Sequence, residues 1–256
     1  MEDLKNKTIL VAGAGGLLGS RLVSALLKSD VKVIAVDIDL TVMTSRLSEL
    51  GVDLNQKQLI CSELNVTNEE SIKSFFSQSD IIIDGAVNTT YPRNKTYGKH
   101  FFDVSLESFN ENLSLHLGSA FLFTQQCASY FDKHQTPFSL VNISSIYGVI
   151  APKFEIYDNT SMTMPVEYAA IKSAILHLNK YVVSYVNDSR FRINCVSPGG
   201  IFDNQPNDFL DAYRKRTHGA GMLDVNEIIG SVLFLLSENS RYVTAQNIIV
   251  DDGFSL

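Results

Sequence analysis

The sequence predicts a single α/β domain of the doubly wound Rossmann type, built on a seven-stranded parallel sheet. Two observations predict this fold. Short apolar runs alternate with segments of helical periodicity along all 256 residues, and a glycine-rich turn joins the first run to the first helical segment. Strands that alternate with helices favour a parallel sheet with helices on both faces. Since no linker, repeat or low-complexity tract interrupts the alternation, we expect residues 1–256 to form one domain.

The expected elements follow from local composition. β-branched residues in "VKVIAVD" indicate a buried strand, and apolar residues at helical spacing in "LLGSRLVSALLKS" indicate a helix. "NEESIKSFF" begins with an asparagine cap and an acidic first turn, which predicts a helix start. In such folds, ligands bind beyond the carboxyl ends of the strands. We expect strands at 8–13, 31–37, 58–66, 84–88, 138–145, 191–200 and 247–253, and helices at 17–29, 68–76, 105–133, 165–187 and 224–237.

Composition excludes several functional classes. The chain is 45% hydrophobic and 19% charged, as in an ordinary water-soluble domain. Its net charge of −7 argues against a nucleic-acid partner, because phosphate contacts need a basic surface. No signal-peptide layout and no run of bilayer length are present, so we expect a cytoplasmic protein without a membrane partner. Cys61, Cys127 and Cys195 form neither a metal-binding spacing nor a disulfide framework, so no metal is expected.

The turn "VAGAGGLLGS" places Gly13, Gly16 and Gly19 three residues apart. Glycine permits a tight turn and lets a pyrophosphate approach the backbone, and the helix that follows offers free N–H groups. Asp37 ends the second expected strand, where an acid binds both ribose hydroxyls of NAD and repels the 2′-phosphate of NADP. Asp39 is a nearby alternative for this role. The pattern therefore predicts a dinucleotide site that prefers NAD(H) over NADP(H).

Two tyrosines stand four residues before a lysine, in "YPRNK" and in "YAAIK". Pro92 biases Tyr91 away from helical geometry, so Tyr91 and Lys95 are expected in a loop. Tyr168 and Lys172 fall in an expected helix and share one of its faces. A nearby ammonium stabilises a phenolate and lowers the tyrosine pKa, which makes a general acid or base usable near neutrality. This pair is therefore the candidate for chemistry.

A serine pair ends the fifth expected strand in "NISS". Ser145 is placed at the carboxyl edge of the sheet, and Ser144 points to the opposite side of an extended strand. With the glycine turn, Asp37, "DGAVN", "NISSIYG", "YAAIK", "NCVSPGG" and "VTAQNIIVDDG", the chain resembles the short-chain dehydrogenase/reductase family over nearly its whole length. The resemblance implies that Ser145 orients a substrate oxygen, Tyr168 transfers a proton, and Lys172 lowers the pKa of Tyr168 and holds the nicotinamide ribose.

The same resemblance implies a set of contacts to the cofactor. They come from the glycine turn, the start of the first helix, and the ends of the strands. In this sequence they are Gly13, Gly16, Leu17, Leu18, Asp37, Asn65, Val66, Asn88, Tyr168, Lys172, Pro198, Gly199 and Ile201.

The chain departs from the family at several of these positions. His116 stands where the family has an asparagine that holds a water beside the catalytic lysine. An imidazole also binds water and passes a proton, but a core histidine is an equal alternative, and Asn112 lies one turn earlier. "NTTY" replaces the family's "NNAG", so Tyr91 takes a glycine's place and is expected to alter the pocket near the adenosine ribose. Asp203 replaces a threonine that contacts the nicotinamide.

Several stretches are more narrowly similar to bacterial flagellin-modification oxidoreductases of the legionaminic-acid type. They include "YPRNKTYGKHFFDV", "MTMPVEYAAIKSAI" and "QNIIVDDGFSL". The similarity implies a sugar phosphate or nucleotide sugar as substrate, bound by loops 89–104, 146–167 and 199–223. Candidate phosphate ligands are Arg93 and Lys95, with Lys99 and His100 nearby, and 213–218 is a second basic stretch. Tyr157, with Asp158 and Asn159, is a candidate sugar contact.

The sequence therefore predicts an NAD(H)-dependent oxidoreductase that interconverts a secondary alcohol and a ketone in bacterial surface-glycan or flagellin-glycan biosynthesis. One alternative is an epimerase or dehydratase that uses NAD catalytically, which the glycine spacing favours. Another is a non-catalytic dinucleotide-binding sensor. The family resemblance implies a homodimer or homotetramer formed through the two long central helices. The sugar, the reacting carbon and the physiological direction are left open.

Overall fold

The sheet has the predicted seven parallel strands. The computed structural model describes residues 2–78 and 81–256. The strand order is β3-β2-β1-β4-β5-β6-β7, with every neighbouring pair parallel. The third strand is shorter than the expected 58–66. The strands are β1 (Thr8–Ala12), β2 (Lys32–Asp37), β3 (Leu59–Glu63), β4 (Gly85–Asn88), β5 (Phe138–Ile143), β6 (Phe191–Pro198) and β7 (Asn247–Val250).

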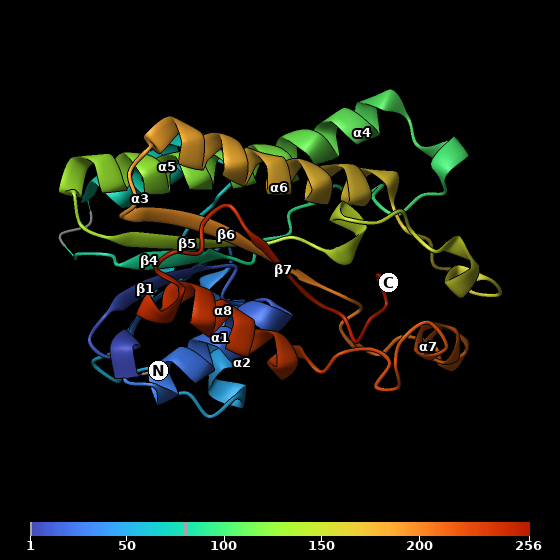
Figure 1. The fold of residues 1–256 in the computed structure, drawn as a ribbon, viewed down its shortest axis with the longest axis horizontal. Coiled ribbons are helices and arrows are strands. Elements are labelled where there is room, and N and C mark those ends of the chain that lie inside the picture. Colours follow the sequence, from blue (N-terminus) through green and yellow to red (C-terminus); the bar gives the residue numbers. More distant parts are fainter. Residues whose placement is uncertain (1, 79–80) are drawn as a thin grey trace.

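Helices cover both faces of this sheet, as Figure 1 shows. On one face lie α3 (Glu69–Gln78), α4 (Leu106–Asn112), α5 (Gly118–His134) and α6 (Val166–Val186); on the other lie α1 (Leu17–Lys28), α2 (Leu40–Glu49) and α8 (Ile229–Leu236). Helix α7 (Asn207–Arg214) lies beyond the sheet, near the C-terminus. Short 3₁₀ turns are η1 (Glu2–Leu4), η2 (Phe101–Asp103), η4 (Ile146–Gly148), η5 (Phe154–Tyr157), η6 (Val225–Ile228) and η7 (Glu238–Ser240). No helix in the described ranges is long and apolar enough to cross a membrane.

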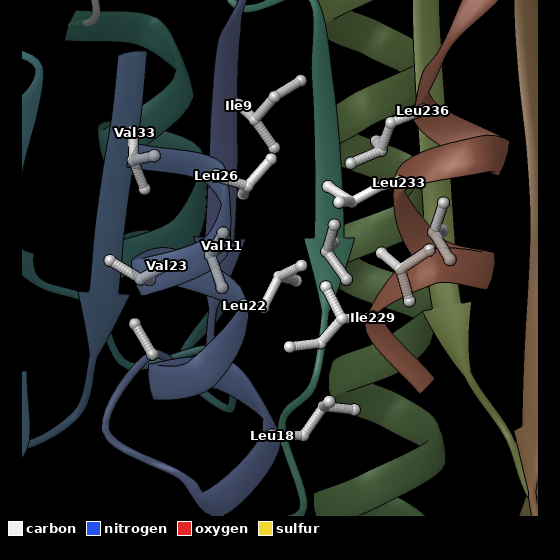
Figure 2. Packing of buried hydrophobic residues seen from close by; sticks show 14 of the residues in the cluster. Ile9, Val11, Leu18, Leu22, Val23, Leu26, Val33, Ile229, Leu233 and Leu236 are labelled. Carbon is white, nitrogen blue, oxygen red and sulfur yellow. The ribbon is translucent and has the colours of Figure 1, made fainter. Parts of the chain in front are cut away.

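Two hydrophobic layers hold the helices to the sheet. Successive side chains of a strand point to opposite faces. Ile9 and Val11 of β1 therefore pack with α1 and α8, as Figure 2 shows, whereas Leu10 and Ala12 pack on the other side with α3, α5 and α6. Burial on both faces explains why the central strands read as continuous apolar runs.

The long helix expected over 105–133 is interrupted. A π-helical segment, η3 (Leu113–Leu117), joins α4 to α5 and contains His116. One extra residue per turn changes the direction of the side chains, and such segments are frequent at functional sites. The apolar periodicity of the sequence does not reveal this interruption.

Helices α2 and α7 were absent from the predicted elements. Asp39 caps α2 by accepting a hydrogen bond from Val42 N at 2.9 Å, but α2 buries only Met43 and Leu47. Helix α7 is short and polar and buries only Phe209 and Tyr213. The expectation of a loop at 213–218 was therefore wrong at its start, because Tyr213 and Arg214 end α7.

The glycine turn is closely packed, and this gives a first prediction. A Cβ at position 19 would lie 2.1 Å from Gly13 O, which is backbone and has little room to move. We expect Gly19→Ala to lower the free energy of unfolding by about 1–3 kcal/mol through overpacking. Gly230→Ala is the control, because a Cβ there meets open space. Urea unfolding of both variants checks the prediction, and an unchanged stability of Gly19→Ala would contradict it.

Candidate active site

A cavity of about 430 Å³ opens at the carboxyl edge of the sheet. It lies beyond the ends of β4, β5 and β6, where the loops that follow these strands meet the start of α1. This is the place where an open parallel sheet binds its ligand. Its lining includes Leu17, Leu18, Tyr91, Ser145, Tyr147, Tyr157, Met162, Met164, Tyr168, Lys172, Pro198, Gly199, Ile201, Phe209, Tyr213 and Met222.

The glycine turn and Asp37 form one end of the site. Gly13 has a φ of 81°, a conformation that favours glycine. The Asp37 carboxylate accepts a hydrogen bond from Gly15 N at 2.8 Å, which fixes it beside the turn. Asp39 caps α2 by accepting a hydrogen bond from Val42 N, and the assignment of Asp37 to the cofactor ribose stays a prediction.

Two asparagines lie beyond neighbouring strand ends. Asn65 Oδ1 accepts hydrogen bonds from Thr67 N at 3.0 Å and Thr67 Oγ1 at 2.7 Å. Asn88 Oδ1 accepts equivalent bonds from Thr90 N at 3.1 Å and Thr90 Oγ1 at 2.7 Å. Both side chains therefore shape the loop that follows their strand. Val66 is buried next to Asn65.

The predicted catalytic residues come together under the cavity. Ser145 follows β5, and its side chain hydrogen-bonds that of Tyr168 on α6. Lys172 lies one turn further along α6 and donates from Nζ to Ile143 O at 2.9 Å. Ser144 points the other way, as expected, and its hydroxyl donates to Lys172 O at 2.8 Å. This last bond ties the end of β5 to α6.

Burial shifts the pKa of both members of the tyrosine–lysine pair. The pKa of Lys172 is lowered from 10.5 to about 8, because burial penalises the ammonium. The pKa of Tyr168 is raised by burial, and the hydrogen bond with Ser145 opposes that rise. The sequence predicted a lowered Tyr168 pKa, which the structure contradicts. Lys172 Nζ is directed to Ile143 O and lies 5.5 Å from the centre of the Tyr168 ring, so desolvation dominates.

The lowered Lys172 pKa predicts a pH-dependent stability. Below about pH 8 the lysine is charged in both states, so folding carries the full cost of burying the ammonium, about 3 kcal/mol. Between about pH 8 and 10.5 the unfolded chain binds more protons, so this cost is progressively removed as pH rises. We therefore expect the stability of Lys172→Met relative to wild type to fall between pH 7 and pH 10. Urea unfolding at both pH values measures it, and a pH-independent difference would contradict the shift.

His116, and not Asn112, lies beside the lysine. Its Nε2 is 3.4 Å from Lys172 Nζ. Burial lowers the pKa of His116 to about 2, and the positive charges of Lys172 and Arg93 contribute to the shift, so the imidazole is neutral. Asn112 is engaged elsewhere, donating to Ser108 O at 3.0 Å and to Glu167 Oε1 at 3.4 Å.

Tyr91 is a site residue whose place the sequence did not predict. It lies in a loop, as expected, and its ring packs on the catalytic group. Its ring centre is 5.6 Å from that of Tyr168 and 5.1 Å from that of His116. Lys172 Nζ lies 5.7 Å from the centre of the Tyr91 ring. Proline after Tyr91 indicated a loop, but no local signal showed where its ring would point.

The candidate substrate residues are only partly brought together. Tyr157 is buried, lines the cavity and places its hydroxyl 3.5 Å from that of Tyr147. Arg93 is exposed at the rim, with its guanidinium 4.8 Å above the Tyr91 ring. Lys95 is also exposed and, like Arg93, is not part of the cavity lining, so its assignment as a phosphate ligand stays a prediction. Lys99, His100, Asp158 and Asn159 are likewise exposed and outside the lining, so their substrate contacts stay predictions too.

The second basic stretch, 213–218, contributes differently from the prediction. Tyr213 lines the cavity, and its hydroxyl accepts a hydrogen bond from Gly200 N at 2.6 Å. Arg216 forms an ion pair with Glu155 at 2.7 Å, so its charge is compensated. The wall also has an apolar part, formed by Met162, Met164, Phe209 and Met222, and a polar part that includes Asp203 and Gln205. No polar or charged motif in the sequence indicated the four apolar residues.

Comparisons with known proteins agree with this geometry. A family model described as "Enoyl-(Acyl carrier protein) reductase" matches residues 13–255. The "Post-translational flagellin modification protein A" of Campylobacter coli is 40% identical, covering 99% of this chain and 100% of that protein. The 7alpha-hydroxysteroid dehydrogenase of Bacteroides fragilis is 25% identical, and the match covers 100% of this chain and 97% of that protein. The crystal structure of a short chain dehydrogenase from Leptospira borgpetersenii with bound NAD+ superposes with a TM-score of 0.87 at 31% identity, covering 100% and 95%. The chain therefore belongs to the short-chain dehydrogenase/reductase family of oxidoreductases.

Proposed function

We propose that the protein is an NAD(H)-dependent oxidoreductase that interconverts a ketone and a secondary alcohol on a sugar phosphate or nucleotide-linked sugar. The observation that carries the proposal is the grouping of Ser145, Tyr168 and Lys172 beneath one cavity. A chain that had kept the fold only to sense a dinucleotide would have no need for this set. The sensor alternative therefore has little support.

The residues present fit a nicotinamide dinucleotide. The open turn at Gly13 and Gly16 and the N-terminus of α1 suit its diphosphate. Asp37 suits the adenosine ribose, and Lys172 suits the nicotinamide ribose. The Leptospira borgpetersenii neighbour holds NAD+, which supports the assignment. Bound NADH would supply the hydride for reduction of the ketone.

The chain's own groups supply the proton and the orientation. In the reduction direction, Ser145 donates a hydrogen bond to the substrate oxygen, and Tyr168 gives its proton to that oxygen as it becomes a hydroxyl. The raised pKa of Tyr168 keeps the phenol protonated at neutral pH. Lys172, buried and directed by Ile143 O, carries charge next to this pair. The oxidation direction reverses each step.

A sugar-type substrate is supported by the cavity and by one relative. The wall combines tyrosine rings, whose faces suit the C–H face of a sugar, with hydroxyl groups that bind its oxygens. Lys172 is the one cation in the described lining, so a substrate phosphate fits best at the rim near Arg93. The Campylobacter coli relative is named for flagellin modification, which supports work on a glycan precursor.

The experiment is a panel of keto sugars, sugar phosphates and nucleotide sugars, with NADH consumption followed by absorbance. The proposal expects turnover on one sugar class and none on steroids or enoyl thioesters. Turnover only on enoyl thioesters would overturn it in favour of the matched family model's description. An epimerase or dehydratase would instead convert its substrate with no net change in NADH, and would retain NAD through purification.

A further inference from the structure

We propose that Glu167 is a positioning residue that holds His116 through a shared buried water, and so fixes the imidazole that faces Lys172. This inference rests on the proposed function for the role of Lys172. It concerns two buried polar groups that the mechanism above does not use.

Both groups have an unpaired polar atom in the described part of the structure. His116 is 2% exposed, and its Nδ1 has no hydrogen-bond partner. Glu167 is 0% exposed, and its Oε2 has no partner either. Leaving a buried polar atom unpaired is costly, so each such atom in a folded protein needs an explanation.

The two side chains belong to elements that pack against each other. His116 lies in the π-helical segment η3, and Glu167 lies in the first turn of α6. Asn112 connects them, because it stands four residues before His116 and donates to Glu167 Oε1 at 3.4 Å. The carboxyl group of Glu167 therefore lies beside the stretch of helix that carries His116.

The proton of His116 must lie on the unpaired nitrogen. Lys172 Nζ is a donor, so the Nε2 atom that faces it at 3.4 Å must accept. Since the imidazole is neutral, its one proton is on Nδ1, which is then a buried donor without an acceptor. Glu167 Oε2 is a buried acceptor without a donor. One water that accepts from Nδ1–H and donates to Oε2 satisfies both groups.

The arrangement gives Glu167 a specific effect on the catalytic group. A neutral imidazole can flip its ring or change its tautomer. A flip would place Cε1–H where Nε2 stands, and a change of tautomer would present an N–H to the Lys172 ammonium. Hydrogen bonding at the far nitrogen sets which nitrogen of a histidine is protonated. The Glu167–water pair thus keeps a lone pair directed at Lys172, whose other polar contact is Ile143 O.

The test combines nuclear magnetic resonance with kinetics. In the full-length protein with ¹⁵N-labelled histidine, His116→Asn identifies the His116 signals. We expect wild type to show the Nδ1–H tautomer alone. Glu167→Gln keeps an acceptor oxygen and should retain it, whereas Glu167→Leu should give mixed tautomers. Imidazolium or Nε2–H in wild type, or an unchanged tautomer in Glu167→Leu, would overturn the proposal. This arm needs no substrate, so its failure is distinct from failure of the proposed function.

The kinetic arm separates positioning from a general structural effect. Glu167→Leu should lower kcat about tenfold, the scale of one lost buried hydrogen bond, with the KM for NADH unchanged. In a His116→Asn background the same substitution should change kcat less than about twofold, because the group it positions is gone. Equal effects of Glu167→Leu in both backgrounds would show that Glu167 does not act through His116.

Discussion

A Tyr168→Phe protein is expected to bind NADH as wild type does and to lose turnover by about a thousandfold, within the range for removal of a general acid. The ring keeps its packing against Tyr91, whose centre lies 5.6 Å away, so the fold and the cofactor site are retained. The hydroxyl that transfers the proton is lost, and Ser145 loses its partner. Steady-state kinetics and fluorescence titration with NADH measure the two effects separately.

The matched control for this variant is Tyr91→Phe. It removes a hydroxyl from a neighbouring ring that pairs with Tyr97 and not with Ser145. We expect its kcat to stay within about tenfold of wild type, the scale of one hydrogen bond. Comparable losses in the two variants would show that Tyr168 has no special role in proton transfer.

The direction of the Tyr168 pKa shift has a consequence for the pH profile. A raised pKa keeps the phenol protonated at neutral pH, which suits the acid needed for reduction. Oxidation needs the phenolate as base, so the rate of oxidation should rise with pH while that of reduction falls. The two profiles therefore run in opposite directions in wild type.

Asp37→Ala is expected to have the second large effect, which is on nucleotide binding at the cofactor end of the site. Loss of two hydrogen bonds to a charged acceptor, each about 1.5–3 kcal/mol, should weaken NADH binding by at least about 100-fold. Binding of NADPH should improve relative to NADH, because the carboxylate that repels a 2′-phosphate is gone. Titrations with both nucleotides give the ratio.

Asp39→Ala is the control for Asp37→Ala. It removes the cap of α2 and should lower the free energy of unfolding by about 1 kcal/mol, with little effect on the choice of nucleotide. If Asp37→Ala left the NADH to NADPH ratio unchanged, or if Asp39→Ala changed it, the assignment of Asp37 to the ribose would be wrong.

The sheet could be predicted because the features that indicate it are contiguous in the sequence. Parallel strands buried on both faces are mostly apolar, as at 9–12, and the motifs follow directly where these strands end. The tyrosine–lysine pair was identified because four residues span one turn of a helix. These features depend on spacing alone.

The remaining features depend on packing between distant segments. Tyr91 reaches His116 and Tyr168 only because the loop after β4 folds back over α6 and the π-helical segment. The pKa of Tyr168 rises because desolvation outweighs its hydrogen bond with Ser145, while the ammonium of Lys172 is directed to Ile143 O. Lys95 is charged and close in sequence to the site, yet it is exposed and is not part of the cavity lining. No periodicity or spacing in the chain encodes these outcomes.

The central claim is tested most directly with NADH that carries deuterium at the transferable C4 position. Wild-type protein is incubated with the sugar panel, and the products are analysed by mass spectrometry beside those of Tyr168→Phe. We predict one deuterium in a newly formed alcohol, one NAD+ for each product, and neither with Tyr168→Phe. A converted sugar without deuterium and without net NAD+ would contradict net reduction and favour an epimerase or dehydratase.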